Sequence, residues 1–231
     1  MALVTVQSTA GLKGVRPLRA DEVTAQAAEV LRHQRVRAIK VGALGSQANV
    51  HAVARLLRRH ADVPAVVDTP MAPTRGSSRL LAARAITVLR DELLPRATLV
   101  TLNADEAAVL VGEPVRTVGE AHDAALAIAR GGAKAVLVKG GHLAGASATD
   151  VLAMGGEVTE LRARRIEGGA AVHGTGCTLA ALVAGRLAVR PTARVDPDTL
   201  LDAVRWAKRV HHAALAAAVD VGGPMRVLVF G

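Results

Sequence analysis

The segment from His173 to Cys177, His-Gly-Thr-Gly-Cys, is a glycine-bracketed loop that leads directly into an apolar, helix-like stretch. Backbone N–H groups at a helix start have no partner within the helix, and the helix dipole adds partial positive charge there. Gly174, Thr175 and Gly176 could therefore hold a phosphate or a developing negative charge. The same residues would also suit an ordinary tight turn before a helix.

Cys177, the only cysteine of the chain, falls in the first turn of that helix. A helix N-terminus stabilises a thiolate and lowers the pKa of a cysteine thiol. Beside an anion-binding loop, such a cysteine could act as a general base or as a nucleophile. A lone cysteine is also commonly a small buried apolar residue. A cysteine hydrolase with His173 as the partner of Cys177 is disfavoured, because the sequence offers no supporting acid framework.

Four polar residues lie at the ends of predicted strands or shortly after them, namely Asp68, Asn103, Glu106 and Lys139. In open α/β sheets, ligands bind at the carboxyl ends of the strands. Oxygen donors such as Asp68, Asn103 and Glu106 suit Mg²⁺, directly or through water. Asn103 would equally suit a helix N-cap, with Glu106 as a favourable acid in the first turn. Lys139, which two glycines follow, could reach a phosphate that is being transferred.

Metal-holding oxygens, a lysine, an anion hole and a base are together the parts of a phosphoryl-transfer site. Such catalysis is mainly positioning and electrostatic stabilisation of the phosphoryl oxygens. The sequence has no Walker A loop, and the loop with Gly174 and Gly176 lacks the third glycine of a Rossmann fingerprint. The site would therefore be assembled from several strand ends and one helix start.

Strand-like and helix-like segments alternate along the chain, which predicts one α/β domain over residues 1–231 with a parallel sheet covered by helices. The expected strands are 3–6, 36–41, 64–68, 98–101 and 135–139, with a hairpin over 150–166 that turns at Gly155-Gly156. The expected helices are 21–33 capped by Asp21, 49–60 capped by Asn49, 79–94, a short one from Asn103, one from Thr117 or Glu120 to about Gly131, the Cys177 helix, and 197–219.

The composition argues against several classes of protein. The formal net charge is +9, but the basic residues are spread along predicted helices, and Trp206 and Phe230 are the only aromatic residues. We therefore expect no nucleic-acid partner, because bases would find no stacking platform. No apolar run approaches the roughly 20 residues of a membrane span, and no secretory signal follows Met1. A single cysteine favours a reducing, cytoplasmic location.

Five motifs follow one another along nearly the whole chain: Ile39-Lys-Val-Gly42, Val66-Val-Asp68, Thr101-Leu-Asn103-Ala-Asp-Glu106-Ala, Val138-Lys-Gly-Gly-His142 and His173-Gly-Thr-Gly-Cys-Thr178. In this order and spacing they resemble the hydroxymethylpyrimidine/phosphomethylpyrimidine kinases of thiamine biosynthesis, in the ribokinase-like superfamily. The last two motifs are the specific part of the resemblance. The resemblance implies a three-layer α/β sandwich with a mostly parallel central sheet flanked by helices.

The resemblance also implies an ATP- and Mg²⁺-dependent kinase that forms a homodimer. Its substrates would be 4-amino-5-hydroxymethyl-2-methylpyrimidine and then the monophosphate of that compound, which gives the pyrophosphate used for thiamine synthesis. Cys177 matches the catalytic base, and Gly174, Thr175 and Gly176 match the anion hole.

The remaining site residues of the family have matches in three groups. Lys139, Asn103 and Thr175 match the ATP-binding residues, and adenine would lie beside the loop before the C-terminal helix. The metal end of the site is matched by Asp68, Asn103 and Glu106. The substrate-binding positions are matched by Gly42, Ala43 and His173.

The sequence departs from the family pattern in four places. Asp68-Thr-Pro-Met71 replaces Asp-Pro-Val-Met, and Thr101-Leu-Asn103 replaces Thr-Pro-Asn. Ala43 stands where the family has a methionine that packs on the pyrimidine. Val4 to Thr9 resembles the family's second strand region, so the family's first strand, its Gly-Ser-Asp-type loop and its helix have no counterpart here. We expect an uncovered sheet edge near the N-terminus.

These departures leave two other functions open. The chain could be a catalytically impaired ribokinase-like module that binds a nucleotide or a pyrimidine. It could also be a kinase for a related hydroxymethyl heterocycle, such as pyridoxine or pyridoxal, because Ala43 enlarges the substrate pocket.

Overall fold

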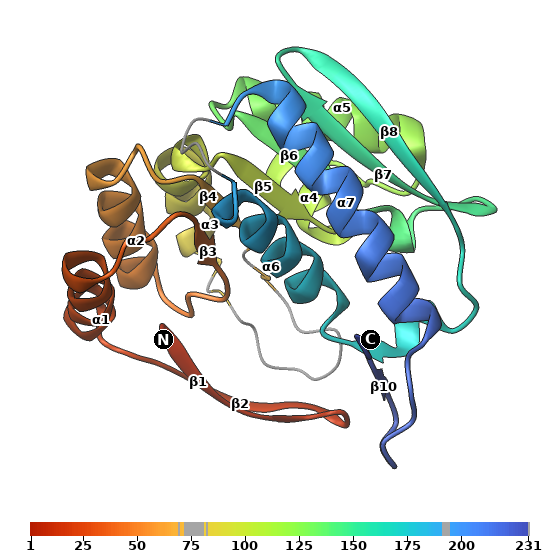
Figure 1. Ribbon diagram of the computed structural model, residues 1–231, viewed down its shortest axis with the longest axis horizontal. Coiled ribbons are helices and arrows are strands. Elements are labelled where there is room, and N and C mark those ends of the chain that lie inside the picture. The colour runs from red at the N-terminus through yellow and green to blue at the C-terminus, as the bar shows by residue number, and fades with distance from the viewer. Residues whose placement is uncertain (69, 72–80, 82, 191–194, 231) are drawn as a thin grey trace.

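A six-stranded sheet forms the centre of the computed structural model, which describes residues 1–68, 70–71, 81, 83–190 and 195–230 (Figure 1). Its strands are, in spatial order, β3 (Ile39–Val41), β4 (Ala65–Val67), β5 (Leu99–Leu102), β6 (Ala135–Val138), β7 (Ser147–Met154) and β8 (Glu157–Arg164). Strands β3 to β6 run parallel, and the antiparallel hairpin β7–β8 extends the sheet beyond β6.

Helices cover both faces of this sheet, as Figure 1 shows. On one face lie α2 (Gln47–Arg59), α3 (Ala85–Val88), α4 (Ala104–Val111) and α5 (Val118–Arg130). On the other face lie α6 (Thr175–Ala188) and α7 (Pro197–Ala216). Helix α1 (Ala20–His33) packs on α2 at the outside. In the described part of the chain, no helix is both long and apolar enough to cross a membrane.

The sheet is apolar on both sides because each face is buried under helices. Val67 and Val100 pack in the core with α2 to α5, whereas their neighbours Val66 and Leu99 pack in the core with α6 and α7. This alternation follows from the two-residue period of a strand. It explains why the central strands read as continuous apolar runs in the sequence.

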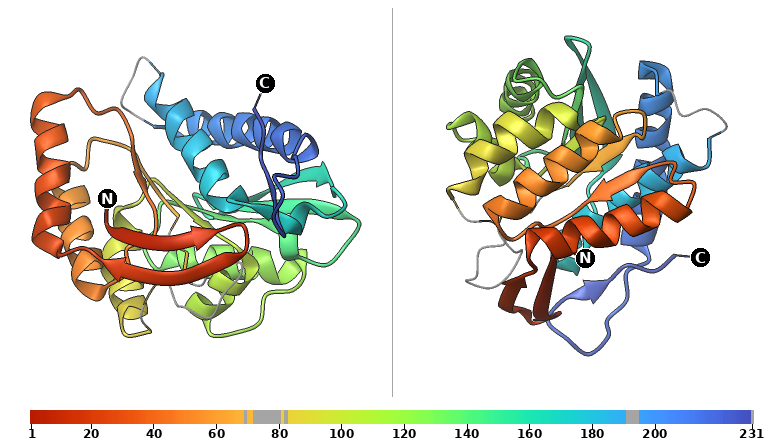
Figure 2. Two further views of the ribbon diagram at one scale, coloured as in Figure 1. Left: turned by 90° about the horizontal axis from the view of Figure 1, so that it is seen from below. Right: turned by 90° about the vertical axis from the view of Figure 1, so that its left-hand side faces the viewer.

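The N-terminal residues form a separate antiparallel hairpin of β1 (Leu3–Ser8) and β2 (Gly11–Pro17). The hairpin stands apart from the main sheet in both views of Figure 2. Strand β3 is therefore an edge strand of the six-stranded sheet. The sequence predicted only the first strand of the hairpin, because two glycines and a proline in 11–17 weaken the strand pattern of the second.

Several boundaries differ from those predicted. Arg19, not Asp21, precedes α1, and Asp21 lies in its first turn as an ion-pair partner of Arg19. Residues 79–80 and 82 of the helix predicted at 79–94 lie outside the described residues. After α3 this segment continues as the π-helix η1 (Leu89–Leu93) and the 3₁₀ turn η2 (Leu94–Arg96), where Pro95 lacks a backbone N–H group.

The C-terminal helix α7 ends at Ala216, before the predicted residue 219. A short strand follows it, β10 (Arg226–Val227), which pairs in parallel with β9 (Val172–His173). The sequence analysis predicted neither of these two-residue strands.

Asn49 ties the N-terminal hairpin to the rest of the molecule. We expected it to cap α2, but Ser46 is the N-cap and Asn49 is fully buried one turn later. Its Nδ2 group lies 3.1 Å from the carbonyl oxygen of Ala2, 3.2 Å from that of Leu18 and 2.8 Å from that of Leu44. Both ends of the hairpin and the loop after β3 therefore meet at one amide group.

We predict that Asn49→Leu lowers the free energy of unfolding by about 1–3 kcal/mol, because the carbonyl groups of Ala2, Leu18 and Leu44 each lose a hydrogen bond, of which the one to Leu44 is buried. Urea denaturation followed by circular dichroism measures this change. Gln47→Leu, a matched change on the same helix, should stay within about 0.5 kcal/mol of the wild type. Equal stabilities of the two variants would show that the Asn49 hydrogen bonds do not hold the hairpin.

Candidate active site

Residues from four neighbouring strands meet around the carboxylate of Asp68, which directly follows β4 and is 3% exposed. Thr101 of β5 donates a hydrogen bond of 2.7 Å to Asp68 Oδ1. Lys139, which follows β6, places its Nζ atom 3.0 Å from the same oxygen. Lys40 of β3 places its Nζ atom 3.7 Å from Oδ2. One buried carboxylate thus holds two lysines that lie far apart in the sequence.

The Asp68 carboxylate and the lysines around it stabilise one another's charged forms. Burial alone would raise the pKa of Asp68, but Lys139, Thr101 and Lys40 outweigh burial and lower it below its usual value. Burial likewise opposes the charged form of Lys139, yet Asp68 and Glu106 raise the pKa of the lysine. The Asp68–Lys139 pair is therefore a charged pair at neutral pH.

Asn103 and Glu106 form a reciprocal cap at the start of α4. Glu106 N donates to Asn103 Oδ1 at 2.8 Å, and Asn103 N donates to Glu106 Oε2 at 2.8 Å. Burial, together with the nearby Asp68, raises the pKa of Glu106, although Lys139 opposes the rise. The capping role that the sequence suggested for both residues is thus present, and it places their oxygens beside the Asp68–Lys139 pair.

The side-chain oxygens of Asp68, Asn103 and Glu106 fit only one mode of Mg²⁺ binding. Among the described residues, no group of three His, Cys, Asp or Glu side chains is arranged to hold a metal ion. Asp68 is already neutralised by lysines, and Asn103 is engaged as a cap. Mg²⁺ usually keeps several waters and binds one or two carboxylates together with substrate phosphates. Asp68 and Glu106 fit such a water- and phosphate-held ion, not a direct three-ligand site.

The glycine loop begins helix α6 next to Lys139. Gly174 is the N-cap in the left-handed conformation, at φ 77°, and it has no side chain to cap the first-turn N–H groups. A Cβ atom on Gly176 would lie 3.0 Å from Lys139 Nζ, so the ammonium group rests directly against the helix start. Positive charge from the lysine and from the helix N-terminus therefore converges on one spot.

Cys177 follows Gly176 in the first turn of α6, and its side chain reaches solvent. Desolvation on its protein-facing side, followed by the charge of Asp68, raises the pKa of the thiol, while Lys40 and Lys139 act in the opposite direction. The lowered pKa expected from a helix N-terminus is therefore wrong in direction for the free protein. The reasons are desolvation of the thiol first and the nearby Asp68 carboxylate second, and the local sequence shows neither.

The three predicted substrate-binding residues lie in different surroundings. A Cβ atom on Gly42 would lie 3.1 Å from Lys40 Nζ, so this glycine makes room for the head of the lysine. Ala43 follows it and is partly buried. His173 lies in β9, where Val227 is its pairing partner. The structure brings Gly42 to the Asp68 cluster through Lys40, and the substrate roles of all three stay predictions.

A second buried carboxylate, Asp150 of β7, was missed by the sequence analysis. Its Oδ1 accepts a hydrogen bond of 2.7 Å from Gly140 N, and its Oδ2 lies 2.7 Å from Lys208 Nζ of α7. Lys208 also donates to the carbonyl oxygen of Ala148 at 3.1 Å. We call the contacts of Asp150 with Gly140 and Lys208 the Asp150 clamp. Because Gly140 directly follows Lys139, this clamp fixes the residue next to the lysine of the site.

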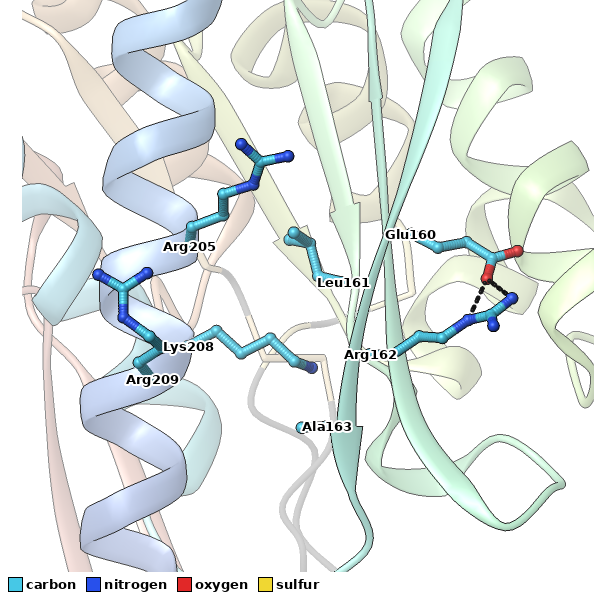
Figure 3. Close-up of a pocket in the computed structure, with 7 residues that line it drawn as sticks. All are labelled: Glu160, Leu161, Arg162, Ala163, Arg205, Lys208 and Arg209. Atoms are coloured by element: carbon cyan, nitrogen blue, oxygen red, sulfur yellow. Dashed lines mark hydrogen bonds and ion pairs between the residues drawn. The ribbon is translucent and has the colours of Figure 1, made fainter.

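A basic cavity of about 240 Å³ lies between β8 and α7. Its lining residues are Glu160, Leu161, Arg162, Ala163, Arg205, Lys208 and Arg209. In Figure 3, Arg205, Lys208 and Arg209 extend from α7, and Leu161 and Ala163 lie on the facing strand. Lys208 belongs both to this cavity and to the ion pair with Asp150.

The family model described as phosphomethylpyrimidine kinase matches residues 1–227. The chain belongs to the phosphomethylpyrimidine kinase family. It is 41% identical to the hydroxymethylpyrimidine/phosphomethylpyrimidine kinase of Rhizobium meliloti (strain 1021), over 93% of this chain and 77% of that protein. It is 40% identical to the enzyme of the same name from Streptomyces coelicolor, over 96% of this chain and 79% of that protein.

Solved structures show the same relationship. A structure described as the last common ancestor of HMPPK and PLK/HMPPK vitamin kinases is 33% identical, with a TM-score of 0.66 over 90% of this chain and 81% of that one. An ADP complex of Bacillus subtilis pyridoxal kinase is 26% identical, with a TM-score of 0.83 over 99% and 82% of the two chains. The predicted family, the ribokinase-like α/β fold and the phosphotransferase class are confirmed.

We predict that Gly140→Ala disturbs the position of Lys139. A Cβ atom on Gly140 would collide with the backbone of Thr149, and an overpacked core site costs about 2 kcal/mol. For a chain of this size the Tm should fall by about 4–8 °C. Gly141→Ala is the matched control, because a Cβ atom there meets no atom within 4 Å. Differential scanning calorimetry and turnover assays should separate the two variants, and a wild-type-like Gly140→Ala would refute the clamp.

Proposed function

We propose that this chain phosphorylates 4-amino-5-hydroxymethyl-2-methylpyrimidine with ATP, and then phosphorylates the resulting monophosphate. The observation that carries the proposal is the position of Lys139, whose ammonium group rests against Gly176 at the start of α6 and pairs with Asp68. A lysine and an open helix N-terminus at one point provide the charge that a transferring phosphoryl group needs. The names of the curated relatives support this substrate class.

In the first step, the hydroxyl oxygen of the substrate attacks the γ-phosphorus of ATP. The bond from this phosphorus to the bridging oxygen breaks, and the electron pair leaves on ADP. Cys177 is the proposed base that takes the hydroxyl proton. Gly174, Thr175 and Gly176 would donate backbone N–H groups to the phosphoryl oxygens, and Lys139 would offset their charge.

In the second step, the acceptor is an oxygen of the phosphate monoester. Its second pKa is about 6, so this oxygen is ionised at neutral pH and no proton has to be removed. The two steps therefore have different catalytic requirements. The first needs a base, and the second needs charge neutralisation between two anionic groups.

The nucleotide would extend from Lys139 toward the cavity between β8 and α7. That Bacillus subtilis pyridoxal kinase was solved with ADP supports nucleotide binding by this fold. Asn103 and Thr175 are the further proposed ATP contacts. The loop predicted to lie beside adenine includes residues 191–194, which lie outside the described residues. Basic side chains of the cavity, Arg205 and Arg209, would face the nucleotide.

Mg²⁺, when bound, would neutralise the phosphates of ATP and align them. Asp68 and Glu106 would hold it through water, with Asn103 beside them. The chain's own residues would orient the phosphates through Lys139 and the first turn of α6.

Pyridoxal phosphorylation is a second candidate activity. It is favoured by the overlap with Bacillus subtilis pyridoxal kinase, at a TM-score of 0.83. The room left by Ala43 favours it as well. A substrate panel of the pyrimidine, its monophosphate and pyridoxal separates the two. Ligand-dependent stabilisation without any product would instead identify a binding module.

We predict that Cys177→Ala lowers kcat for the hydroxymethyl substrate by about 100-fold or more, because a positioned base contributes at least this much. The affinity for ATP, measured by calorimetry, should change by no more than about twofold. The monophosphate reaction, which needs no base, should be much less affected. An unchanged kcat for the hydroxymethyl substrate would refute the role of Cys177.

The pH profile follows from the same residue. The thiolate is the active form and the pKa of the Cys177 thiol is raised, so its population grows as the pH rises through the neutral range. The kcat/KM of the first step should therefore rise by about tenfold per pH unit below that pKa. A flat profile in the wild type would contradict the proposal.

We also propose a homodimer that forms through the N-terminal hairpin. Val4 and Val6 are two residues apart in β1 and therefore lie on the same face of the strand, with exposures of 41% and 65%. An exposed apolar face on an edge hairpin is a typical site of association. The cytoplasmic location stays a prediction from the single cysteine.

We predict that Val6→Lys shifts the protein from dimer to monomer, because the change would bury a charge in the interface. Size-exclusion chromatography with light scattering measures the mass. Val109→Lys is the matched control, since Val109 is 50% exposed on α4. Dissociation by both variants, or by neither, would rule out the hairpin as the interface.

A further inference from the structure

We propose that Lys40 binds the phosphate of the monophosphate acceptor and thereby determines the specificity of the second phosphorylation. The inference rests on the proposed function and assigns a role to a residue that the sequence analysis did not single out. It is carried by the position of Lys40 relative to Lys139.

The two lysines lie on opposite sides of Asp68. Lys139 contacts Oδ1 and rests against Gly176, at the helix start that would receive the phosphoryl group of ATP. Lys40 faces Oδ2 and rests against Gly42, in the segment that matches the acceptor-binding residues. Lys139 therefore lies on the side of the carboxylate where ATP, the phosphoryl donor, would bind. Lys40 lies on the side where the phosphoryl acceptor would bind.

The ion pairs made by the two lysines are unequal. Lys139 donates a hydrogen bond of 3.0 Å to Asp68. Lys40 Nζ is 3.7 Å from the carboxylate, beyond hydrogen-bond distance, and its side chain is 25% exposed. To the described residues Lys40 donates no hydrogen bond, although an ammonium group has three N–H donors. Lys40 is therefore a partly desolvated cation whose donors are available to a ligand.

The second phosphorylation is the reaction that needs such a cation. An oxygen of the acceptor phosphate attacks the γ-phosphorus, a P–O–P linkage forms, and the bond to the bridging oxygen breaks with its electron pair on ADP. No proton changes place in this step. The acceptor phosphate, with a charge of about −2, must approach the polyphosphate of ATP. An ammonium group on the acceptor side reduces this repulsion and binds the phosphate by charge-assisted hydrogen bonds.

In the part of the chain that the structure describes, we assign the neighbouring cations of the cavity to the ATP side of the site. Arg205, Lys208 and Arg209 surround the cavity at β8, the edge of the sheet opposite to β3. Lys208 is engaged with Asp150. Among the described residues of the Asp68 cluster, Lys40 is the cation next to Gly42 and Ala43.

The test compares the two acceptors in one variant. Lys40→Gln should raise the KM for the monophosphate by about 10- to 100-fold, the contribution of a hydrogen bond to a charged group. The KM for the hydroxymethyl compound should change by no more than about threefold. Lys40 also lies near Cys177, so kcat of the first step can fall as well. The decisive quantity is therefore the ratio of the two kcat/KM values, which should drop at least about tenfold.

Two variants control for charge and for structure. Lys134→Gln removes the same charge at an exposed position before β6, at the end opposite to Lys139, and should leave the ratio unchanged. Lys40→Arg keeps a cation and should restore most of the preference for the monophosphate. If Lys40→Gln does not fold, Lys40→Met, which keeps the aliphatic stem, replaces it. An equal loss for both acceptors would show that Lys40 only supports Asp68, and would overturn the proposal.

Calorimetry without ATP separates this inference from the proposed function. The wild type should bind the monophosphate at least about tenfold more tightly than the hydroxymethyl compound, and Lys40→Gln should abolish the difference. If the wild type forms no product but shows this difference, the kinase function fails and phosphate binding by Lys40 stands. If the wild type binds both compounds equally or binds neither, the role of Lys40 is refuted, whatever the activity.

Discussion

The buried pair of Asp68 and Lys139 is the interaction on which the site depends. Either charge alone would lose its hydration without compensation, so removing one partner leaves a buried, unpaired ion. The pair joins the residue after β4 to the residue after β6 across the intervening strand β5, whose Thr101 completes the contact. It also aims the ammonium group at the start of α6. The contacts of the Asp68 carboxylate therefore help to fix the relative position of three strands and one helix.

Asp150 and Lys208 repeat this arrangement at the next strand of the sheet. Their ion pair connects β7 to α7, and the second carboxylate oxygen of Asp150 holds the N–H group of Gly140. Lys139 is thus held through its side chain by one carboxylate, and the following peptide group is held by another. A flexible lysine gains a fixed direction in this way, which electrostatic catalysis requires because a misplaced charge stabilises little.

The sequence predicted those parts of the site that obey a topological rule. Asp68, Asn103 and Lys139 stand at the carboxyl ends of parallel strands, which necessarily share one edge of the sheet. Asp150 lies in an antiparallel strand, to which that rule does not apply, and Lys208 is one of several basic residues on a long helix. Lys40 reads as an ordinary strand lysine until Asp68 is found opposite it. The direction of the Cys177 pKa depends on the same through-space distances, which no local pattern contains.

The pairing of β10 with β9 links the end of the fold to the order in which the chain is made. Strand β9 ends at His173, directly before Gly174, and residues 226–227 supply its partner. During synthesis, the glycine loop and most of α6 leave the ribosome roughly 50 residues before that partner, which at about 5–20 residues per second is several seconds. The strand that leads into the glycine loop can therefore complete its backbone pairing only after Val227 has emerged.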